Sequence, residues 1–196
     1  KQAVQLAFEK IEQNLVLSSW KDSFSSSRTP QRLMEYIQVP EFGCFKDEKK
    51  RMFNTDASPV MNKIWSIGGK TGWYYGNILW RIRGFMDKLV GGVGLRRGRT
   101  NNTTIDAGDA LDFWRVLVAD KKAMRLLLYA EMKLPGEAWL EFQITPVEDN
   151  FELKQTATFR PKGVWGRLYW YGSWPFHYFI FNGMINKLSK GKEDKN

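Results

Sequence analysis

The pattern of apolar and polar residues predicts a sheet in the second half of this chain. Apolar and polar residues alternate over 124–134, 138–145 and 151–160. Because successive side chains of a strand point to opposite faces of a sheet, this period of two predicts an antiparallel meander with one apolar and one polar face. The segments Pro135-Gly136 and Glu148-Asp149-Asn150 supply the turns between the strands.

The first forty residues have a different pattern. Apolar residues at three- and four-residue steps predict an amphipathic helix over about the first fifteen residues, and a short strand from Asn14 to Trp20 follows it. The polar segment Ser23–Pro30 then separates these elements from the rest. We therefore expect residues 1–40 to be a small unit with a linker, and residues 41–196 to form the main domain.

A strand near Cys44–Phe53 and two helices are predicted before the meander. Ser58-Pro59 marks the start of the first helix, since serine suits the N-cap and proline suits the first helical position. This helix ends at Gly68-Gly69. The second helix is predicted over Trp73–Leu89 and ends at Gly91-Gly92.

The apolar segment Val164–Leu188 is predicted to be a long helix that covers the apolar face of the sheet. Each large apolar side chain left in water forfeits roughly 1.5–3 kcal/mol, so this face needs a cover. Gly172 and Pro175 are expected to kink the helix, because proline removes an intrahelical hydrogen bond. Together these elements predict an α+β helix-grip fold, in which an antiparallel sheet wraps a long C-terminal helix.

The composition narrows the functional classes. The chain has 196 residues, and nine of them are Trp. Its length and its 43% of hydrophobic residues suffice to form one hydrophobic core. The single cysteine, Cys44, excludes an internal disulfide and agrees with a reducing, cytoplasmic compartment. The formal charge of +9 comes from scattered Lys and Arg, which favours solvated surfaces over nucleic-acid binding. The first residues contain no secretory signal and no initiator methionine, so we expect a piece of a longer protein.

Two patterns resemble cofactor motifs but lie in the wrong context. The glycines at 91–94 follow a helix, whereas a dinucleotide loop follows a strand and opens a helix. Tyr129 and Lys133 match a Tyr-x-x-x-Lys pair, but on a strand they lie about 13 Å apart. His177 is the only histidine, and common metal sites need more nitrogen or sulfur ligands than this chain holds. We therefore expect neither a cofactor site nor a metal site in this chain.

The aromatic residues exceed what one sheet face needs. They either fill an ordinary core or line a partly open apolar pocket between sheet and long helix, where Tyr and Trp orient a ligand through their polar tips. Arg81 or Arg83 is a candidate anchor for an anionic group. By strand alternation, Trp139 faces away from the apolar side of the sheet. The candidate ligand-binding residues are Trp73, Tyr74, Trp80, Arg81, Arg83, Trp114, Trp139, Tyr171 and His177.

Several segments carry a resemblance to a known family. They are Gly68–Tyr75, Leu79–Gly84, Gly108–Val116, Lys133–Phe142 and Trp165–Tyr171, with Pro175-Phe176-His177 beyond. From Pro59 to Leu188 the chain resembles an uncharacterised domain family at the C-terminus of bacterial proteins related to nucleoside-diphosphate-sugar epimerases and NAD(P)-binding short-chain dehydrogenases. That family is similar to the START/Bet-v-1-like (SRPBCC) helix-grip superfamily, which often holds apolar ligands in a cavity.

The resemblance implies an accessory role. Residues 1–40 resemble the C-terminal remnant of a dehydrogenase-like domain, but the nucleotide-binding glycine loop and the catalytic helix of such a domain are absent. NAD(P) would therefore be bound by a preceding N-terminal domain and not by this chain. The resemblance implies no catalytic residue.

Three functional hypotheses follow. The first is a domain, non-catalytic alone, that binds a small apolar or aromatic ligand beside its N-terminal NAD(P)-binding domain. The second is docking to a partner protein or a membrane surface through the aromatic C-terminal helix, since Trp, Tyr and a basic tail suit an interface. The third is a cyclase or hydrolase that uses His177 and a tyrosine, and only fold analogy supports it. We expect a cytoplasmic protein, with peripheral membrane contact under the second hypothesis.

Overall fold

The computed structural model describes residues 38–54, 56–89, 91–92, 94, 99 and 104–190. The helix and the strand predicted within the first twenty residues, and the linker that follows them, lie outside the described residues. The same is true of most of the glycine-rich segment after residue 90.

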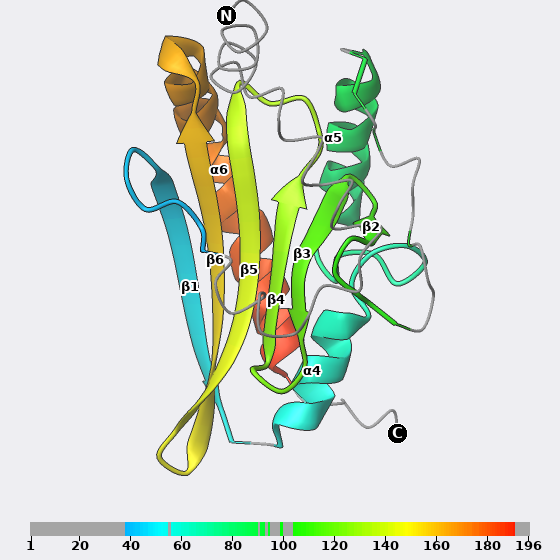
Figure 1. The fold of residues 1–196 in the computed structure, drawn as a ribbon, viewed down its shortest axis with the longest axis vertical. Coiled ribbons are helices and arrows are strands. Elements are labelled where there is room, and N and C mark those ends of the chain that lie inside the picture. The colour runs from blue at the N-terminus through cyan, green and yellow to red at the C-terminus, as the bar shows by residue number, and fades with distance from the viewer. Residues whose placement is uncertain are drawn as a thin grey trace, which may run out of the picture.

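Six antiparallel strands form one sheet in the order β1-β6-β5-β4-β3-β2 (Figure 1). The predicted meander and the predicted first strand are confirmed. The strands are β1 (Phe45–Phe53), β2 (Ala110–Leu111), β3 (Trp114–Asp120), β4 (Arg125–Ala130), β5 (Gly136–Val147) and β6 (Asn150–Pro161). The edge strand β1 pairs with β6 and so joins the first part of the chain to the last strand of the meander.

The two faces of the sheet differ in composition, but the face predicted to be polar is partly apolar. Leu126 and Leu128 belong to the main core, whereas Leu127, between them, belongs to a second buried cluster with Tyr129 and Trp139. The run of three leucines allows β4 to bury apolar side chains on both faces. Two ion pairs lie beside this second cluster in the sheet, Arg115–Glu131 at 3.0 Å and Arg125–Glu141 at 2.6 Å.

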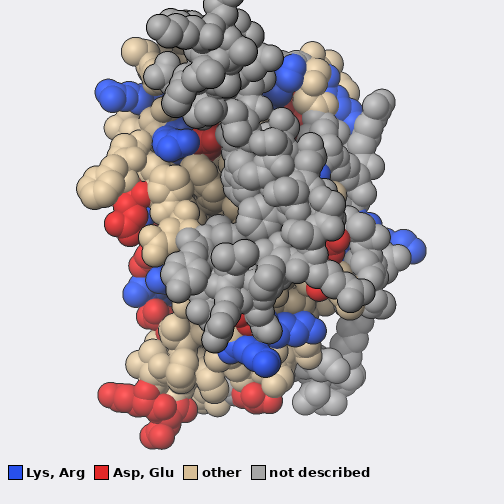
Figure 2. All heavy atoms as spheres, viewed as in Figure 1, with Lys and Arg blue, Asp and Glu red and all other residues tan. Residues whose placement is uncertain are grey.

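Charged side chains on the outer face of the sheet are dispersed. Figure 2 shows Lys and Arg at several separate places on the face turned to the viewer. Carboxylates gather at the lower end of this view, where the turn between β5 and β6 lies. Glu148 and Asp149 form that turn. The described cations in this view therefore form no single patch.

The helix α4 (Ala57–Trp65) begins earlier than the sequence predicts. Its N-cap is Asp56, whose carboxylate accepts a hydrogen bond from the amide of Ser58 at 3.3 Å. Pro59 therefore lies in the first turn but not at its first position. The missing N–H of proline is harmless there, because the first amides of a helix have no intrahelical acceptor.

The helix α5 (Asn77–Leu89) begins later than predicted, at Asn77 and not at Trp73. Gly72, Tyr74 and Gly76 all have positive φ, of 70°, 60° and 65°, which a right-handed helix excludes. Asn77 fixes the turn, because its Oδ1 accepts a hydrogen bond from the amide of Trp73 at 2.9 Å. The three aromatics that precede α5 thus lie in a loop.

The helix α6 (Gly163–Ser189) is the long helix that the sequence predicts, and it continues through Gly172 and Pro175 as one element. Figure 1 shows it on the far side of the sheet, with α5 beyond the β2–β3 edge. In its first half, the ring of Trp170 stacks on Phe45 of β1 and on Phe159 of β6, with centroid distances of 5.5 and 5.8 Å. In its second half, Met184 and Ile185 are fully buried. The α+β helix-grip fold is confirmed.

The loop before α5 depends on a buried hydrogen bond, in which Trp73 Nε1 donates to Asp112 Oδ2 at 2.8 Å. Asp112 has a φ of 55°, which Asn tolerates and Ala does not. We expect Asp112→Ala to lower the free energy of unfolding by about 2–3 kcal/mol, because it leaves a buried donor unpaired at a strained position. Asp112→Asn keeps an acceptor and the backbone preference, so it should lose less than half of that in urea denaturation. Equal losses would contradict this role of the hydrogen bond.

Two glycines of α6 provide a matched test of its packing. A Cβ at Gly172 meets no atom within 4 Å, whereas a Cβ at Gly183 would overlap the ring of Tyr75. Gly172→Ala should raise the free energy of unfolding by up to about 1 kcal/mol through helix propensity. Gly183→Ala should lower it by about 1–3 kcal/mol through overpacking, despite the same gain in propensity. Stabilisation by both substitutions, measured in urea, would show that Tyr75 does not pack against α6.

Candidate functional site

A cavity of about 440 Å³ lies between α5, α6 and the sheet. The helix α5 contributes Leu79, Trp80, Ile82, Arg83 and Met86. The sheet side contributes Trp114, Met132, Leu134, Ala138, Ala157 and Phe159, among others. The helix α6 forms the opposite wall with Tyr169, Trp170, Phe176, His177, Ile180 and Phe181. The cavity is therefore lined mainly by apolar and aromatic side chains.

The cavity opens between the two helices. Ile82 and Met86 of α5 and Phe176 of α6 line it, yet these side chains are 49%, 54% and 56% exposed. The floor is buried, since Ala157 and Phe159 are 7% and 2% exposed. A small molecule could thus enter from solvent past apolar side chains.

Five of the nine predicted site residues border the cavity: Trp80, Arg83, Trp114, Trp139 and His177. Trp139 is a special case among these five, because it lies on β5 between Ala138 and Leu140, which both pack in the main core. Its own ring packs against Tyr129, with a centroid distance of 5.6 Å, in the second cluster. This agrees with the expectation that Trp139 faces away from the apolar side of the sheet.

The other four predicted residues lie outside the cavity. Trp73 is buried behind Trp80, with a ring-centroid distance of 5.0 Å, and its indole N–H is bound to Asp112. The Tyr74 hydroxyl donates a hydrogen bond to the carbonyl of Lys63 at 3.1 Å. Arg81 is exposed on α5. The ring of Tyr171 lies edge-on to Phe45, and Tyr171 is two-thirds exposed.

Several lining residues were missed from the sequence, although their spacing could have indicated them. Leu79 and Met86 were missed, although they lie four residues before and three residues after the predicted Arg83 and so share its helix face. Phe176 and Ile180 are likewise four residues apart on α6. The predicted list contains only Trp, Tyr, Arg and His, so it omits Leu79, Met86, Phe176 and Ile180.

His177 is a half-buried ionisable group of the cavity wall. Its ring lies edge-on to Trp170 and beside Phe181, each at a centroid distance of 5.1 Å. Burial lowers the pKa of His177 from 6.5 to about 4; Asp47 opposes this shift and Lys49 adds to it. The imidazole is therefore neutral at pH 7. Its Nδ1 is buried and has no hydrogen-bond partner within the described part of the chain.

Arg83 is the one cationic side chain among the lining residues. Its guanidinium lies over the ring of Tyr169, 5.9 Å from the centroid. One of its nitrogens donates a hydrogen bond to the carbonyl of Lys133 at 3.4 Å. These contacts hold a positive charge beside the cavity, where it could attract an anionic end of a ligand.

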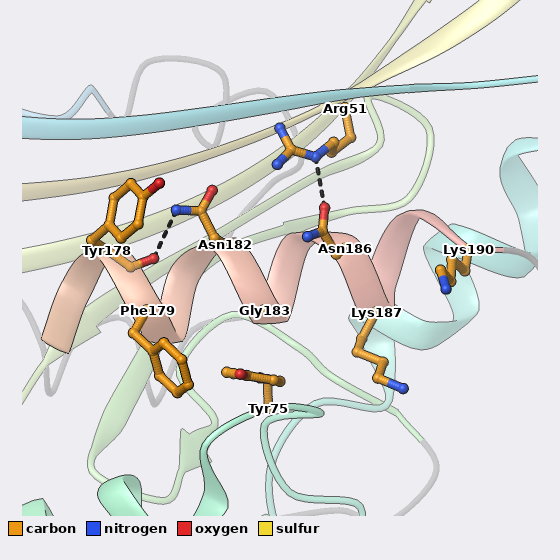
Figure 3. A pocket seen from close by; sticks show the side chains of 9 residues that line it. All are labelled: Arg51, Tyr75, Tyr178, Phe179, Asn182, Gly183, Asn186, Lys187 and Lys190. Atoms are coloured by element: carbon orange, nitrogen blue, oxygen red, sulfur yellow. Dashed lines mark hydrogen bonds between the residues drawn. The ribbon is translucent and has the colours of Figure 1, made fainter.

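A second, open pocket of about 470 Å³ lies on α6 (Figure 3). Arg51 reaches it from β1 and donates a hydrogen bond from Nε to Asn186 Oδ1 at 2.6 Å. Asn182 donates to the carbonyl of Tyr178 at 2.8 Å. Because the polar groups of these side chains already have protein partners, this pocket is the weaker candidate.

The described residues contain no group of three His, Cys, Asp or Glu side chains that could hold a metal ion. The lining residues of the cavity include no carboxylate either. The arrangement therefore offers apolar contact, one cation and a neutral imidazole.

Solved structures of low sequence identity share this fold. A truncated norcoclaurine synthase from Thalictrum flavum is 8% identical, with a TM-score of 0.50, over 82% of this chain and 100% of that chain. Another structure of norcoclaurine synthase from Thalictrum flavum is 7% identical, with a TM-score of 0.46, over 74% of this chain and 84% of that chain. At such identities the likeness concerns the fold alone, and it confirms the helix-grip, Bet v 1-like architecture.

Sequence comparison identifies the family of this chain. No curated protein sequence matches the chain. Residues 44–184 match DUF2867, which is described as a protein of unknown function. Since this match spans well over half of the chain, the protein belongs to the DUF2867 family.

Proposed function

We propose that this domain binds a small apolar or aromatic molecule in the cavity between α5, α6 and the sheet. The observation that carries the proposal is the cavity itself, of about 440 Å³, whose walls are aromatic and aliphatic. Ligand pockets commonly measure about 300–1,000 Å³ and are lined mainly by apolar groups with few polar ones.

The packing of the rest of the domain supports a site over an accidental void. Protein interiors are close-packed, and voids larger than a water molecule are few. Trp73, Trp80 and Phe113 pack closely beside the cavity, with ring centroids 5.0–6.3 Å apart. The aromatic side chains thus fill the neighbouring core while a large apolar space stays open beside them.

The polar groups of the cavity suggest how a ligand would lie. The apolar part would contact the floor formed by Ala157 and Phe159. A polar or anionic end would lie near Arg83, at the partly exposed side of the cavity. The neutral ring of His177 would pack against the apolar part.

The contents of the cavity do not favour catalysis by this domain alone. A side chain whose pKa is about 4 is a weak base at neutral pH, which makes His177 a poor general base or acid there. The lining side chains include no Asp or Glu, so no carboxylate is present to act as a nucleophile or as a general acid or base. A cyclase or hydrolase function therefore has less support than binding.

The link to an epimerase or dehydrogenase domain that binds NAD(P) remains a prediction from the resemblance. If such a domain precedes this one, the cavity would hold a substrate, product or effector for it. Binding to this chain alone is tested first, because it needs no partner.

The first test fills the cavity. We expect the double substitution Ala138→Leu/Ala157→Leu to weaken binding of the apolar anionic dye 1-anilinonaphthalene-8-sulfonate about tenfold or more, because the added side chains occupy ligand space. The matched control is Ala123→Leu, an exposed position between β3 and β4 away from the cavity. Dye fluorescence measures the affinity, and native mass spectrometry of the purified chain shows any ligand retained from the cell. Equal affinity in both variants would place the dye elsewhere.

The charge at the opening is tested with the same dye. Arg83→Gln should weaken dye binding about threefold to tenfold, because it removes the cation that faces the sulfonate. Arg81→Gln, two residues away and exposed on α5, removes the same charge outside the cavity and should leave the affinity unchanged. If both substitutions weaken binding equally, only the net charge attracts the dye.

His177 gives a direct test of the cavity wall, because it is the only histidine and yields one imidazole signal. NMR titration should give a midpoint near pH 4, against an ordinary value of 6.5. The unfolded chain takes up a proton near pH 6.5 and the folded chain does not, so the free energy of unfolding should fall as the pH drops from 6.5 to about 4. His177→Leu should remove this part of the pH dependence. A midpoint of 6 to 7 would show a solvated ring and revive the catalytic hypothesis.

A further inference from the structure

We propose that the outer faces of α5 and α6 form a docking surface for an anionic lipid bilayer, placed around the opening of the cavity. The proposal goes beyond ligand binding and does not require the cavity to be occupied. It rests on the exposed apolar side chains of the two helices, on their charges and on their position relative to the opening.

The helix α5 exposes a stripe of apolar side chains. Ile78, Ile82, Phe85 and Leu89 follow one another at steps of four, three and four residues, so they lie on one side of the helix. They are 72%, 49%, 62% and 71% exposed. The side of α5 that carries Trp80 is buried in the core. The exposed stripe therefore has no partner among the described residues.

The helix α6 exposes apolar side chains over most of its length. Trp165 is 77% exposed and Val164 is 70% exposed, and Leu168, Tyr171 and Phe179 are each more than half exposed. Large exposed apolar surfaces are uncommon on soluble monomers and mark interaction sites. Trp and Tyr are the aromatic residues favoured at the boundary between lipid and water.

The charges of the two helices are of one sign at the surface. Asp87 is the only carboxylate in either helix, and it is fully buried. Its oxygens accept hydrogen bonds from the backbone amides of Gly94 and Lys133, at 2.8 and 2.7 Å. Arg81 and Arg167, in contrast, are exposed beside the apolar side chains.

This combination favours a bilayer over a second copy of the chain. If the same surfaces of two copies met, arginines would face arginines without any exposed carboxylate from these helices. An anionic bilayer offers an apolar interior for the side chains and negative headgroups for the cations. None of the described helices is both long and apolar enough to span a membrane, so α5 and α6 would lie on the surface.

The opening of the cavity lies within the proposed docking surface. Ile82 and Phe176 line the cavity and are also about half exposed, so they belong to both features. Docking would bring the opening against the lipid. An apolar molecule could then pass between bilayer and cavity without crossing bulk water.

The test measures binding of the full chain to lipid vesicles. We expect the chain to cosediment with vesicles of phosphatidylcholine mixed with phosphatidylglycerol, more strongly than with phosphatidylcholine alone, and to be released by high salt. The total tryptophan emission should shift to the blue on binding, because the exposed ring of Trp165 leaves water, and Trp165→Phe should reduce this shift. Absence of binding to the anionic vesicles at low salt would overturn the proposal.

Two pairs of substitutions distinguish this surface from others. Phe85→Glu/Trp165→Glu should lower the vesicle partition coefficient about tenfold or more, since each added negative charge opposes an anionic surface. The matched control, Met52→Glu/Val147→Glu, adds the same charges at exposed apolar positions on β1 and β5, and should retain binding. Arg81→Gln/Arg167→Gln keeps the apolar side chains and should lose the preference for phosphatidylglycerol.

Self-association through the same side chains would show that the surface binds a second copy of the chain and not a bilayer. If gel filtration with light scattering gives a dimer that Phe85→Glu/Trp165→Glu converts to a monomer, the surface is an interface between copies and the proposal fails. Equal vesicle binding by that variant and its matched control would overturn it as well. Circular dichroism of each variant confirms that the fold is retained.

Discussion

The stacking of Trp170 on Phe45 and Phe159 is the contact on which the arrangement of this domain depends. Phe45 and Phe159 are register partners on β1 and β6, so their rings lie side by side on the inner face of the sheet. The flat indole packs nearly parallel to both, at 10° and 6°. Gly166 allows the start of α6 to come close to the carbonyl of Pro135. The line along which α6 crosses the sheet is thereby fixed near its N-terminal end.

The cavity follows from where α6 is held and where it is not. The buried side chains Met184, Ile185 and Leu188 hold its C-terminal end against the core. On the other side, the hydrogen bond between Trp73 and Asp112 holds the loop before α5 and leaves Trp80 packed inward. The helix α6 and the loop before α5 are thus held at separate places, and the cavity lies between the two helices and the sheet.

The features of this fold and of the cavity that could be predicted from the sequence are those that leave a local pattern of apolar and polar residues. Strand alternation identified the sheet, because the period of two reflects burial on one face. The start of α5 was misplaced, because the positive φ of Tyr74 leaves no mark in the hydrophobic pattern. The aromatic and charged lining residues Trp80 and Arg83 were predicted, but the exclusion of Trp73 depends on its bond to Asp112, 39 residues away. The spacing of apolar residues along the chain does not indicate contacts between residues so far apart.

Pro175 has a mechanical consequence for the wall of the cavity. Proline has no amide hydrogen, so the carbonyl of Tyr171 has no donor four residues later in α6. Bending the helix at this turn therefore breaks one hydrogen bond fewer than bending it elsewhere. The turn lies between the stacked Trp170 and the firmly packed Ile185, beside the lining residues Phe176 and His177. The most compliant point of α6 thus coincides with residues that line the cavity, so the width of the cavity is the dimension that changes at the lowest cost.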